Sequence, residues 1–182
     1  MDTIYRLRAN RSSYDGKKAI TQRLLLGMCF LVLVPAMAAA QSADDRRAWG
    51  YGFVAPGSTS RDNSATIHFG GGGEGLIHKG LGVGVEIGYL GPARSLGEGF
   101  GIFSANGSYH FVKPGSDQKL VPFVTGGYSL GFRTGFANGG NFGGGVQYWA
   151  SDRFGLRLEF RDHVLSIGNV HFYEFRAGIS FR

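Results

Sequence analysis

The sequence predicts an all-β fold: an eight-stranded antiparallel up-and-down β-barrel that spans a membrane, preceded by a helical signal peptide. Three observations predict it. After residue 41, no window keeps the 3.6-residue apolar period of a helix, whereas apolar and polar residues alternate in eight runs. Turn-forming residues separate these runs. Residues 24–40 form an apolar leader behind a basic segment.

The leader, residues 1–40, has the layout of a secretory signal peptide. Arg23 and five earlier basic residues precede the apolar run LLLGMCFLVLVPAMAAA, which the small residues Ala38–Ala40 close. The run is short for a membrane-spanning helix and Pro35 interrupts it, so a retained N-terminal anchor is only the alternative. We expect cleavage near residue 40 and a mature domain over residues 41–182, with strands from about residue 49.

Composition excludes several classes of protein. Residues 1–40 carry a net charge of +4 and residues 41–182 carry +2, which together make the formal +6. Most of the excess charge therefore lies in the leader, and we expect no nucleic-acid partner. The single cysteine, Cys29, excludes a disulfide framework and a multi-cysteine metal site. Aromatic residues make up 14% of the chain, too many for a disordered polar tract.

The expected strands follow one another along the mature chain. They are the alternating runs 49–55, 66–74, 81–89, 103–111, 121–132, 142–150, 154–161 and 173–181, of which only 121–132 has no clear register. The expected turns are Pro56–Ser58, Lys79–Gly80, Gly91–Pro92, 113–117, Asn138–Asn141, Ser151–Asp152 and Gly168–Asn169. Both chain ends should then face the periplasm, with residues 113–119. The loops near 56–64, 91–99, 132–141 and 164–171 should face outward.

The apolar face of each strand is expected to contact lipid, which includes Trp49, Tyr51, Phe53 and Ala55 in the first run. Aromatic residues near strand ends favour this orientation, since two lipid interfaces require aromatic girdles; they are Trp49, Tyr51, Tyr89, Tyr109, Phe111, Tyr148 and Tyr173. Closure into a barrel would also remove every open sheet edge from a chain without disulfides.

Charged residues alternate on the opposite face of the last two strands. Arg157, Glu159 and Arg161 share one face of the seventh run, and Glu174 and Arg176 share one face of the eighth. We expect ion pairs between these two strands, with Glu74 and Glu86 in reach, inside a narrow lumen. These seven residues are predicted to plug the lumen; the alternative is that they tune a narrow conductance or a gate.

Two segments resemble the small outer-membrane β-barrel family related to the OmpA transmembrane domain and OmpX. In NFGGGVQYWASDRFGLRLEFRDHV (residues 141–164), a glycine-rich strand, a short polar turn and a G-x-R-x-E-x-R strand follow one another. The ending FYEFRAGISFR (residues 172–182) is similar to the terminal strand that the outer-membrane assembly machinery recognises, although Arg182 follows the last aromatic residue. The resemblance implies an eight-stranded barrel in a bacterial outer membrane.

Other chemical motifs are weak. Gly70-x-Gly72-x-x-Gly75 opens no helix, so it lacks the helix N-terminus that a dinucleotide site needs. The five histidines show no metal-ligand spacing, and His68 and His110 should hydrogen-bond inside the lumen. A lipid-modifying hydrolase would need a serine–histidine pair with a carboxylate, and the seventh loop offers such residues: His163, Ser166 and His171, with Asp162 or Glu159.

The sequence thus predicts a non-catalytic outer-membrane barrel with a structural or surface-interaction role. We expect no catalytic residue, no cofactor and no metal site. The expected partners are outer-membrane lipids and the assembly machinery, which would recognise the C-terminal strand; the protein is expected to be a monomer. A periplasmic lipocalin-like ligand-binding barrel and the lipid-modifying hydrolase are the alternatives.

Overall fold

The computed structural model describes residues 48–112, 118–166 and 168–182, so the expected signal peptide lies outside the described residues. These residues form β1 (Ala48–Thr59), β2 (Ala65–His78), β3 (Leu81–Pro92), a 3-10 helix (Leu96–Glu98), β4 (Phe100–His110), β5 (Leu120–Phe132), β6 (Phe136–Trp149), β7 (Phe154–Leu165) and β8 (Val170–Phe181). No helix in this part of the chain is long and apolar enough to cross a membrane.

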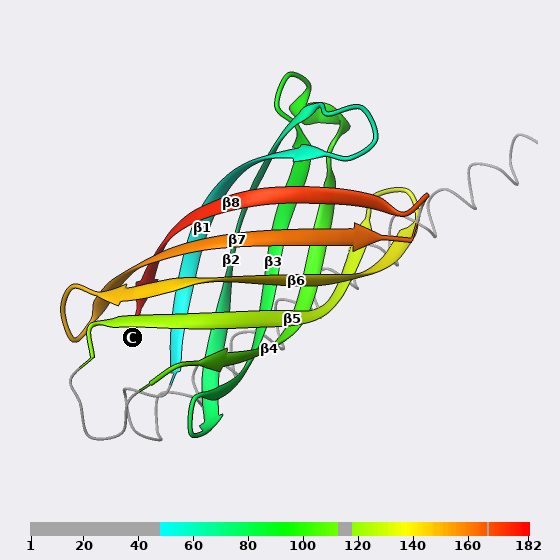
Figure 1. The fold of residues 1–182 in the computed structure, drawn as a ribbon. Helices are drawn as coiled ribbons and strands as arrows, with labels where there is room; N and C mark the ends of the chain where they lie inside the picture. The colour runs from blue at the N-terminus through cyan, green and yellow to red at the C-terminus, as the bar shows by residue number, and fades with distance from the viewer. Residues whose placement is uncertain (1–47, 113–117, 167) are drawn as a thin grey trace, which may run out of the picture. The chain divides into compact units, whose positions relative to one another are not determined.

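The eight strands form one closed antiparallel sheet. Each strand pairs with the next, and β8 returns to pair with β1 from Gly50↔Phe181 to Thr59↔Phe172. Figure 1 shows the strands side by side around a common axis, in the order of the sequence. This confirms the predicted up-and-down barrel. Closure gives the backbone groups of β1 and β8 a partner strand, as a hydrocarbon environment requires.

The outer face of the barrel is apolar. Side chains such as Leu158 on β7 and Phe175 on β8 are 57% and 69% exposed, whereas Arg157 and Arg176 beside them in the sequence are 3% exposed. Charged groups lie inside and apolar groups outside, which is the distribution of a transmembrane barrel. A soluble ligand-binding barrel needs the reverse, so the structure does not support the lipocalin-like alternative.

One strand has the opposite orientation to the one predicted. The aromatic face of β1 points into the lumen, where Trp49, Tyr51, Phe53 and Ala55 pack in one cluster with Trp149. Val54 and Gly52 lie on the outer face instead. Large rings on β1 fill interior space that the glycines of β2 leave empty: a β-carbon on Gly72 would lie 2.9 Å from the Tyr51 hydroxyl oxygen.

The aromatic girdles consequently lack Trp49 and Tyr51. The tyrosines that do point outward lie in two groups, near the two ends of the barrel: Tyr89, Tyr128 and Tyr173 at one end, Tyr109 and Tyr148 at the other. Phe111 lies beside the second group and is half exposed. Two such levels of amphipathic rings are typical of a barrel that meets two membrane interfaces.

Several strands are longer than predicted, because glycine-rich segments expected as turns lie inside them. Pro56–Ser58 belongs to β1, Gly91–Pro92 to β3 and Asn138–Asn141 to β6. At Gly57 and Gly139 a β-carbon would lie 2.3 Å and 2.2 Å from a carbonyl oxygen of the neighbouring strand. These glycines therefore permit close strand approach rather than a change of chain direction.

The predicted turns at Lys79–Gly80 and Gly168–Asn169 are confirmed. All four residues have positive φ, with Lys79 at 41° and Gly80 at 87°, as tight hairpins require. The β2–β3 and β6–β7 connections lie where β1 begins and β8 ends, which we call the terminal end; β4 ends and β5 begins at this end too. The other four connections lie at the opposite end, which we call the loop end. The expected turn at 113–117 lies outside the described residues.

The apolar outer face leads to a prediction for β7. Leu158→Arg places a charge near the middle of the outer face, and we expect it to lower the free energy of unfolding by about 2–4 kcal/mol. Phe154→Arg, at the end of the same face, should cost only about 0–1 kcal/mol because the side chain reaches the interface. Urea unfolding of both variants in lipid vesicles measures the difference; equal losses would contradict a lipid-facing β7.

Candidate functional site in the barrel lumen

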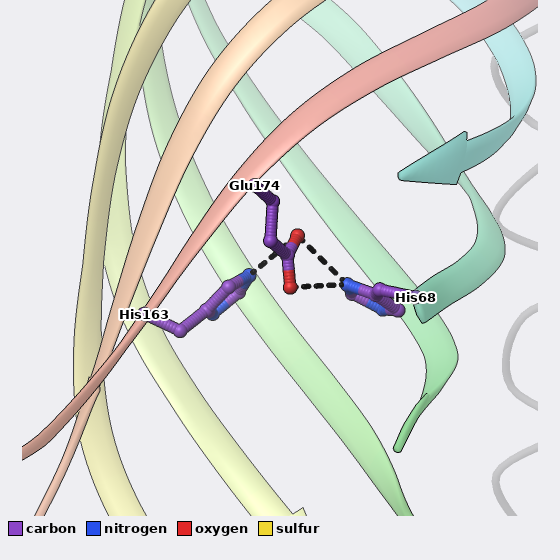
Figure 2. A group of neighbouring side chains, drawn as sticks. All are labelled: His68, His163 and Glu174. Carbon is purple, nitrogen blue, oxygen red and sulfur yellow. Dashed lines mark hydrogen bonds and ion pairs between the residues drawn. The ribbon is translucent and has the colours of Figure 1, made fainter. Parts of the chain in front are cut away.

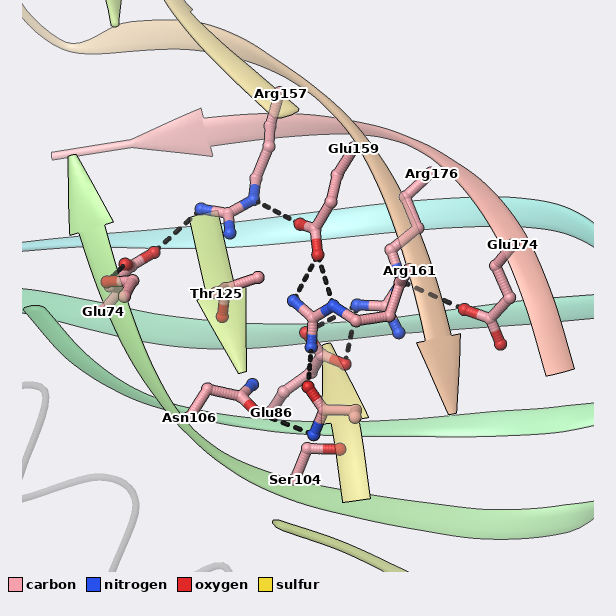
Figure 3. Close-up of polar contacts among 12 residues, drawn as sticks. Glu74, Glu86, Ser104, Asn106, Thr125, Arg157, Glu159, Arg161, Glu174 and Arg176 are labelled. Carbon is pink, nitrogen blue, oxygen red and sulfur yellow. Dashed lines mark hydrogen bonds and ion pairs between the residues drawn. The ribbon is translucent and has the colours of Figure 1, made fainter. Parts of the chain in front are cut away.

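The structure brings the seven predicted charged residues together inside the barrel. Each is at most 7% exposed, and they come from four strands: Glu74 from β2, Glu86 from β3, Arg157, Glu159 and Arg161 from β7, and Glu174 and Arg176 from β8. Residues two apart on a strand point to the same face, so β7 and β8 each present a row of charges to the lumen. Figure 3 shows these side chains converging there.

Glu159 lies between the two arginines of its own strand. Its Oε2 accepts a hydrogen bond from Arg157 Nε at 2.9 Å, and its Oε1 accepts from Arg161. Arg157 also reaches across the lumen, where its second guanidinium nitrogen lies 2.8 Å from Glu74 Oε2. A chain of alternating charges therefore connects β7 to β2.

Arg176 is the centre of a second group. Its Nε lies 3.0 Å from Glu174 Oε2 on the same strand, and its terminal nitrogen lies 2.9 Å from both carboxylate oxygens of Glu86 on β3. Tyr51 donates its hydroxyl proton to Glu86 Oε2 at 3.1 Å. Since a guanidinium bonds well to two carboxylates at once, Arg176 links β8 to β3 and, through Glu86, to β1.

The ion pairs differ from the predicted pattern in their direction. Among the described residues, the arginine–glutamate pairs run along a strand or across the lumen, not directly between β7 and β8. Long side chains on a strongly curved wall converge on its axis, and the inner glycines of β2 and β3 leave them room. At Gly88 a β-carbon would lie 2.4 Å from His68 Nε2.

Polar residues outside the predicted set extend the network. Arg161 donates to Asn141 Oδ1 at 2.9 Å, and Asn141 donates to Ser129 Oγ at 2.9 Å. Ser129 Oγ lies 3.0 Å from His163 Nδ1, and His163 Nε2 lies 2.8 Å from an Arg176 nitrogen. These bonds join the two charged groups into one network. The two-residue alternation of each strand places these residues on the inner face. Their partners lie on other strands, and the sequence alone does not show which side chains meet.

Two histidines end the network, as expected for hydrogen-bonded lumen residues. His110 Nε2 lies 2.7 Å from Glu74 Oε1, which also accepts from Ser108. His68 Nδ1 lies 3.0 Å from both oxygens of Glu174. Hydrogen bonds thus connect His110 on β4, near the terminal end, to His68 on β2 at the other side of the charged cluster.

His68, His163 and Glu174 form a compact group whose candidate ligand atoms lie within 4.8 Å of one another (Figure 2). Two imidazoles and a carboxylate are a common ligand set for zinc. However, a nitrogen of Arg176 lies 3.2 Å from His68 Nδ1 and 2.8 Å from His163 Nε2. A metal ion would have to displace this guanidinium and so break its pair with Glu86, so we assign the group to the charged network.

Apolar layers lie on both sides of the charged network. Towards the terminal end, the Trp49 ring packs edge-on against Trp149 at 5.9 Å and His110 at 5.2 Å, and Arg157 lies 4.0 Å above the Phe123 ring. Towards the loop end, Leu90, Ile102 and Leu165 are buried, and Phe100 contacts Phe172 at 5.9 Å. The charges therefore lie in a low-dielectric layer where they depend on one another for neutralisation.

The structure separates the residues that the hydrolase alternative would need. His163 points into the lumen, whereas His171 lies on the outer face, with its Nδ1 2.8 Å from Asp162 Oδ2. Glu159 also lies in the lumen, bonded to two arginines. The two histidines therefore lie on opposite faces of the sheet. His171 and Asp162 do form a histidine–carboxylate pair, but among the described residues no hydrogen bond joins the Ser166 hydroxyl to either histidine.

The geometry around Glu159 leads to a stability prediction. Glu159→Gln leaves Arg157 and Arg161 short of a shared counterion in a buried site, and we expect a loss of about 3–5 kcal/mol in unfolding free energy. Glu98→Gln on the exposed 3-10 helix serves as the matched control and should change it by less than about 0.5 kcal/mol. Urea titration of folded protein in vesicles measures both. If Glu159→Gln left the unfolding free energy unchanged, the network would contribute nothing to stability.

Comparison with known proteins supports the fold. No family model and no curated protein matches the chain. Among solved structures, it is similar to Neisserial surface protein A, with a TM-score of 0.57 and 16% identity over 74% of this chain and 96% of that one. It is also similar to the N-terminal β-barrel domain of OprF from Pseudomonas aeruginosa, with a TM-score of 0.54 and 14% identity over 75% and 98% of the two chains. The chain therefore has the fold of the small eight-stranded outer-membrane β-barrels.

Proposed function

We propose that this chain is an exported, non-catalytic outer-membrane β-barrel with a structural or surface-interaction role, whose lumen is closed by its charged network. The observation that carries the proposal is the apolar outer face around an interior that holds seven charged side chains. Hydrocarbon is the environment that suits such a wall, and a closed barrel pairs its backbone groups internally, as a bilayer requires.

The plug role rests on how the interior is filled. Three guanidiniums and four carboxylates meet in one hydrogen-bonded network, and aromatic or aliphatic layers lie above and below it. An eight-stranded barrel has an interior just wide enough for side chains, which leaves no room for a broad aqueous channel beside such a network. A structural barrel fits this interior better than a general porin does.

The proposed partners follow from the outer face and from the last strand. Lipid acyl chains would contact the apolar outer face. The assembly machinery would recognise β8, whose outward residues alternate as Tyr173, Phe175, Ala177, Ile179 and Phe181. A monomer suffices for this role, because closure of β8 onto β1 leaves no strand edge for a second chain.

Membrane fractionation with cysteine labelling tests the proposed location. In a Cys29→Ser background, single cysteines at Ser60 and Asn169 lie at the loop end and one at Asp152 lies at the terminal end. A membrane-impermeant maleimide added to intact cells should label the first two only, and lysis should expose the third. A soluble protein, or labelling of Asp152→Cys alone in intact cells, would contradict the proposed location or orientation.

Planar-bilayer recording separates a plug from a gate. We expect the folded protein to show no discrete conductance steps, because its charged side chains hold one another across the lumen. Heat-modifiable gel mobility of the same reconstituted sample controls for insertion. Reproducible discrete steps from inserted protein would favour the alternative, in which these charges tune a narrow pore.

A further inference from the structure

Basic residues recur at the terminal end of the barrel, each beside an apolar residue of the outer face. We call them the basic rim: Lys79, Lys119, Arg153 and Arg182. Lys119 and Arg153 directly precede Leu120 and Phe154, which are 51% and 59% exposed. Arg182 directly follows Phe181, and Lys79 lies in the turn between Ile77 and Leu81. A basic residue next to an exposed apolar residue therefore occurs at four places around this end of the barrel.

The basic rim surrounds the barrel, and among the residues that the structure describes there is little negative charge near it. Its members lie at the β2–β3 turn, the start of β5, the start of β7 and the end of β8. Asp152 is the only acidic residue that the structure describes at this end. The positive charge is therefore spread around the circumference, as contact with a planar surface would require, rather than gathered in one pocket.

The loop end differs from the terminal end in the balance of its charges and in the direction of its basic side chains. It carries Arg61, Arg94 and Arg133, but also Asp62 and Glu98. Arg133 donates to the Glu98 and Gly97 carbonyl oxygens at 2.7 Å and 2.8 Å, so its guanidinium is directed into the loops. The basic rim is thus a property of one end and not of the basic composition of the whole domain.

We propose that the basic rim binds the headgroups of anionic phospholipids in the leaflet at the terminal end. This inference rests on the proposed membrane location. Lysine and arginine place their aliphatic stems along an apolar wall and their charges at the headgroups, and each rim residue lies where the apolar outer face ends. Arg182 lies at the mouth of the lumen instead, because its guanidinium carbon lies 3.9 Å above the ring of the lumen residue Trp149 and its Nε donates to the Asp152 carbonyl oxygen. The headgroup contact therefore rests mainly on the exposed side chains of Lys79, Lys119 and Arg153.

The expected size of the effect follows from the charge count. A basic residue next to an anionic membrane surface favours binding by about fivefold, so three such residues together should favour the folded, inserted state by about 100-fold. The preference should weaken as salt is raised, because exposed charges are screened over about 10 Å at 0.1 M ionic strength.

The test refolds the full chain from urea into vesicles of phosphatidylcholine alone or of phosphatidylcholine mixed with phosphatidylglycerol. Heat-modifiable gel mobility gives the folded fraction, and the urea midpoint gives the folding equilibrium. We expect the anionic vesicles to favour folding of the unmodified chain. The variant Lys79→Gln, Lys119→Gln, Arg153→Gln should lose this preference, whereas Lys79→Arg, Lys119→Arg, Arg153→Lys should keep it.

A variant with the same charge loss at the loop end, Arg61→Gln, Arg94→Gln, Arg133→Gln, serves as the second control. If it loses the anionic preference as fully as the rim variant does, the effect belongs to net charge and the inference is wrong. An unchanged preference of the rim variant for anionic vesicles would also overturn the inference. Failure of the unmodified chain to insert into either vesicle would instead count against the proposed membrane location.

Discussion

A chain that crosses hydrocarbon must pair every backbone N–H and C=O group within itself, and the pairing of β8 with β1 meets that demand here. Much else in the structure follows from this closure. Eight strands enclose a space only a few side chains wide. Alternation then sends every second residue into that space and every other one into lipid. The fold therefore assigns each strand position either to the lumen or to the lipid.

Charged side chains can occupy this narrow interior only as a mutually neutralising set. Glu159 bonds to two arginines, and Arg176 bonds to two glutamates and contacts two histidines. Arg157 and Arg176 also pair with Glu74 on β2 and Glu86 on β3, so the network connects parts of the wall that are not neighbours in the sheet. The inner glycines are part of the same solution, since β2 and β3 leave the room that Tyr51 and His68 fill.

Most of the fold could be predicted from the sequence, but less of the site. Two-residue alternation predicted eight strands and the seven lumen charges, because a strand's period is independent of its partners. It could not orient β1, where aromatic residues fill the lumen and Val54 faces outward. Nor could it distinguish glycines that turn the chain, such as Gly80, from those that let strands approach, such as Gly139. The meeting of His68, His163 and Glu174 depends on barrel curvature, which no local pattern encodes.

Fluorescence quenching by brominated acyl chains tests most directly which face of the wall meets lipid. The only two tryptophans of the chain, Trp49 and Trp149, lie inside the lumen. Folded protein in brominated vesicles should therefore keep most of its emission, whereas a third tryptophan introduced as Leu158→Trp should be strongly quenched. Strong quenching of the native tryptophans, with an unquenched Leu158→Trp, would mean that the face with Trp49 and Trp149 meets lipid and the face with Leu158 does not. This result would contradict the account.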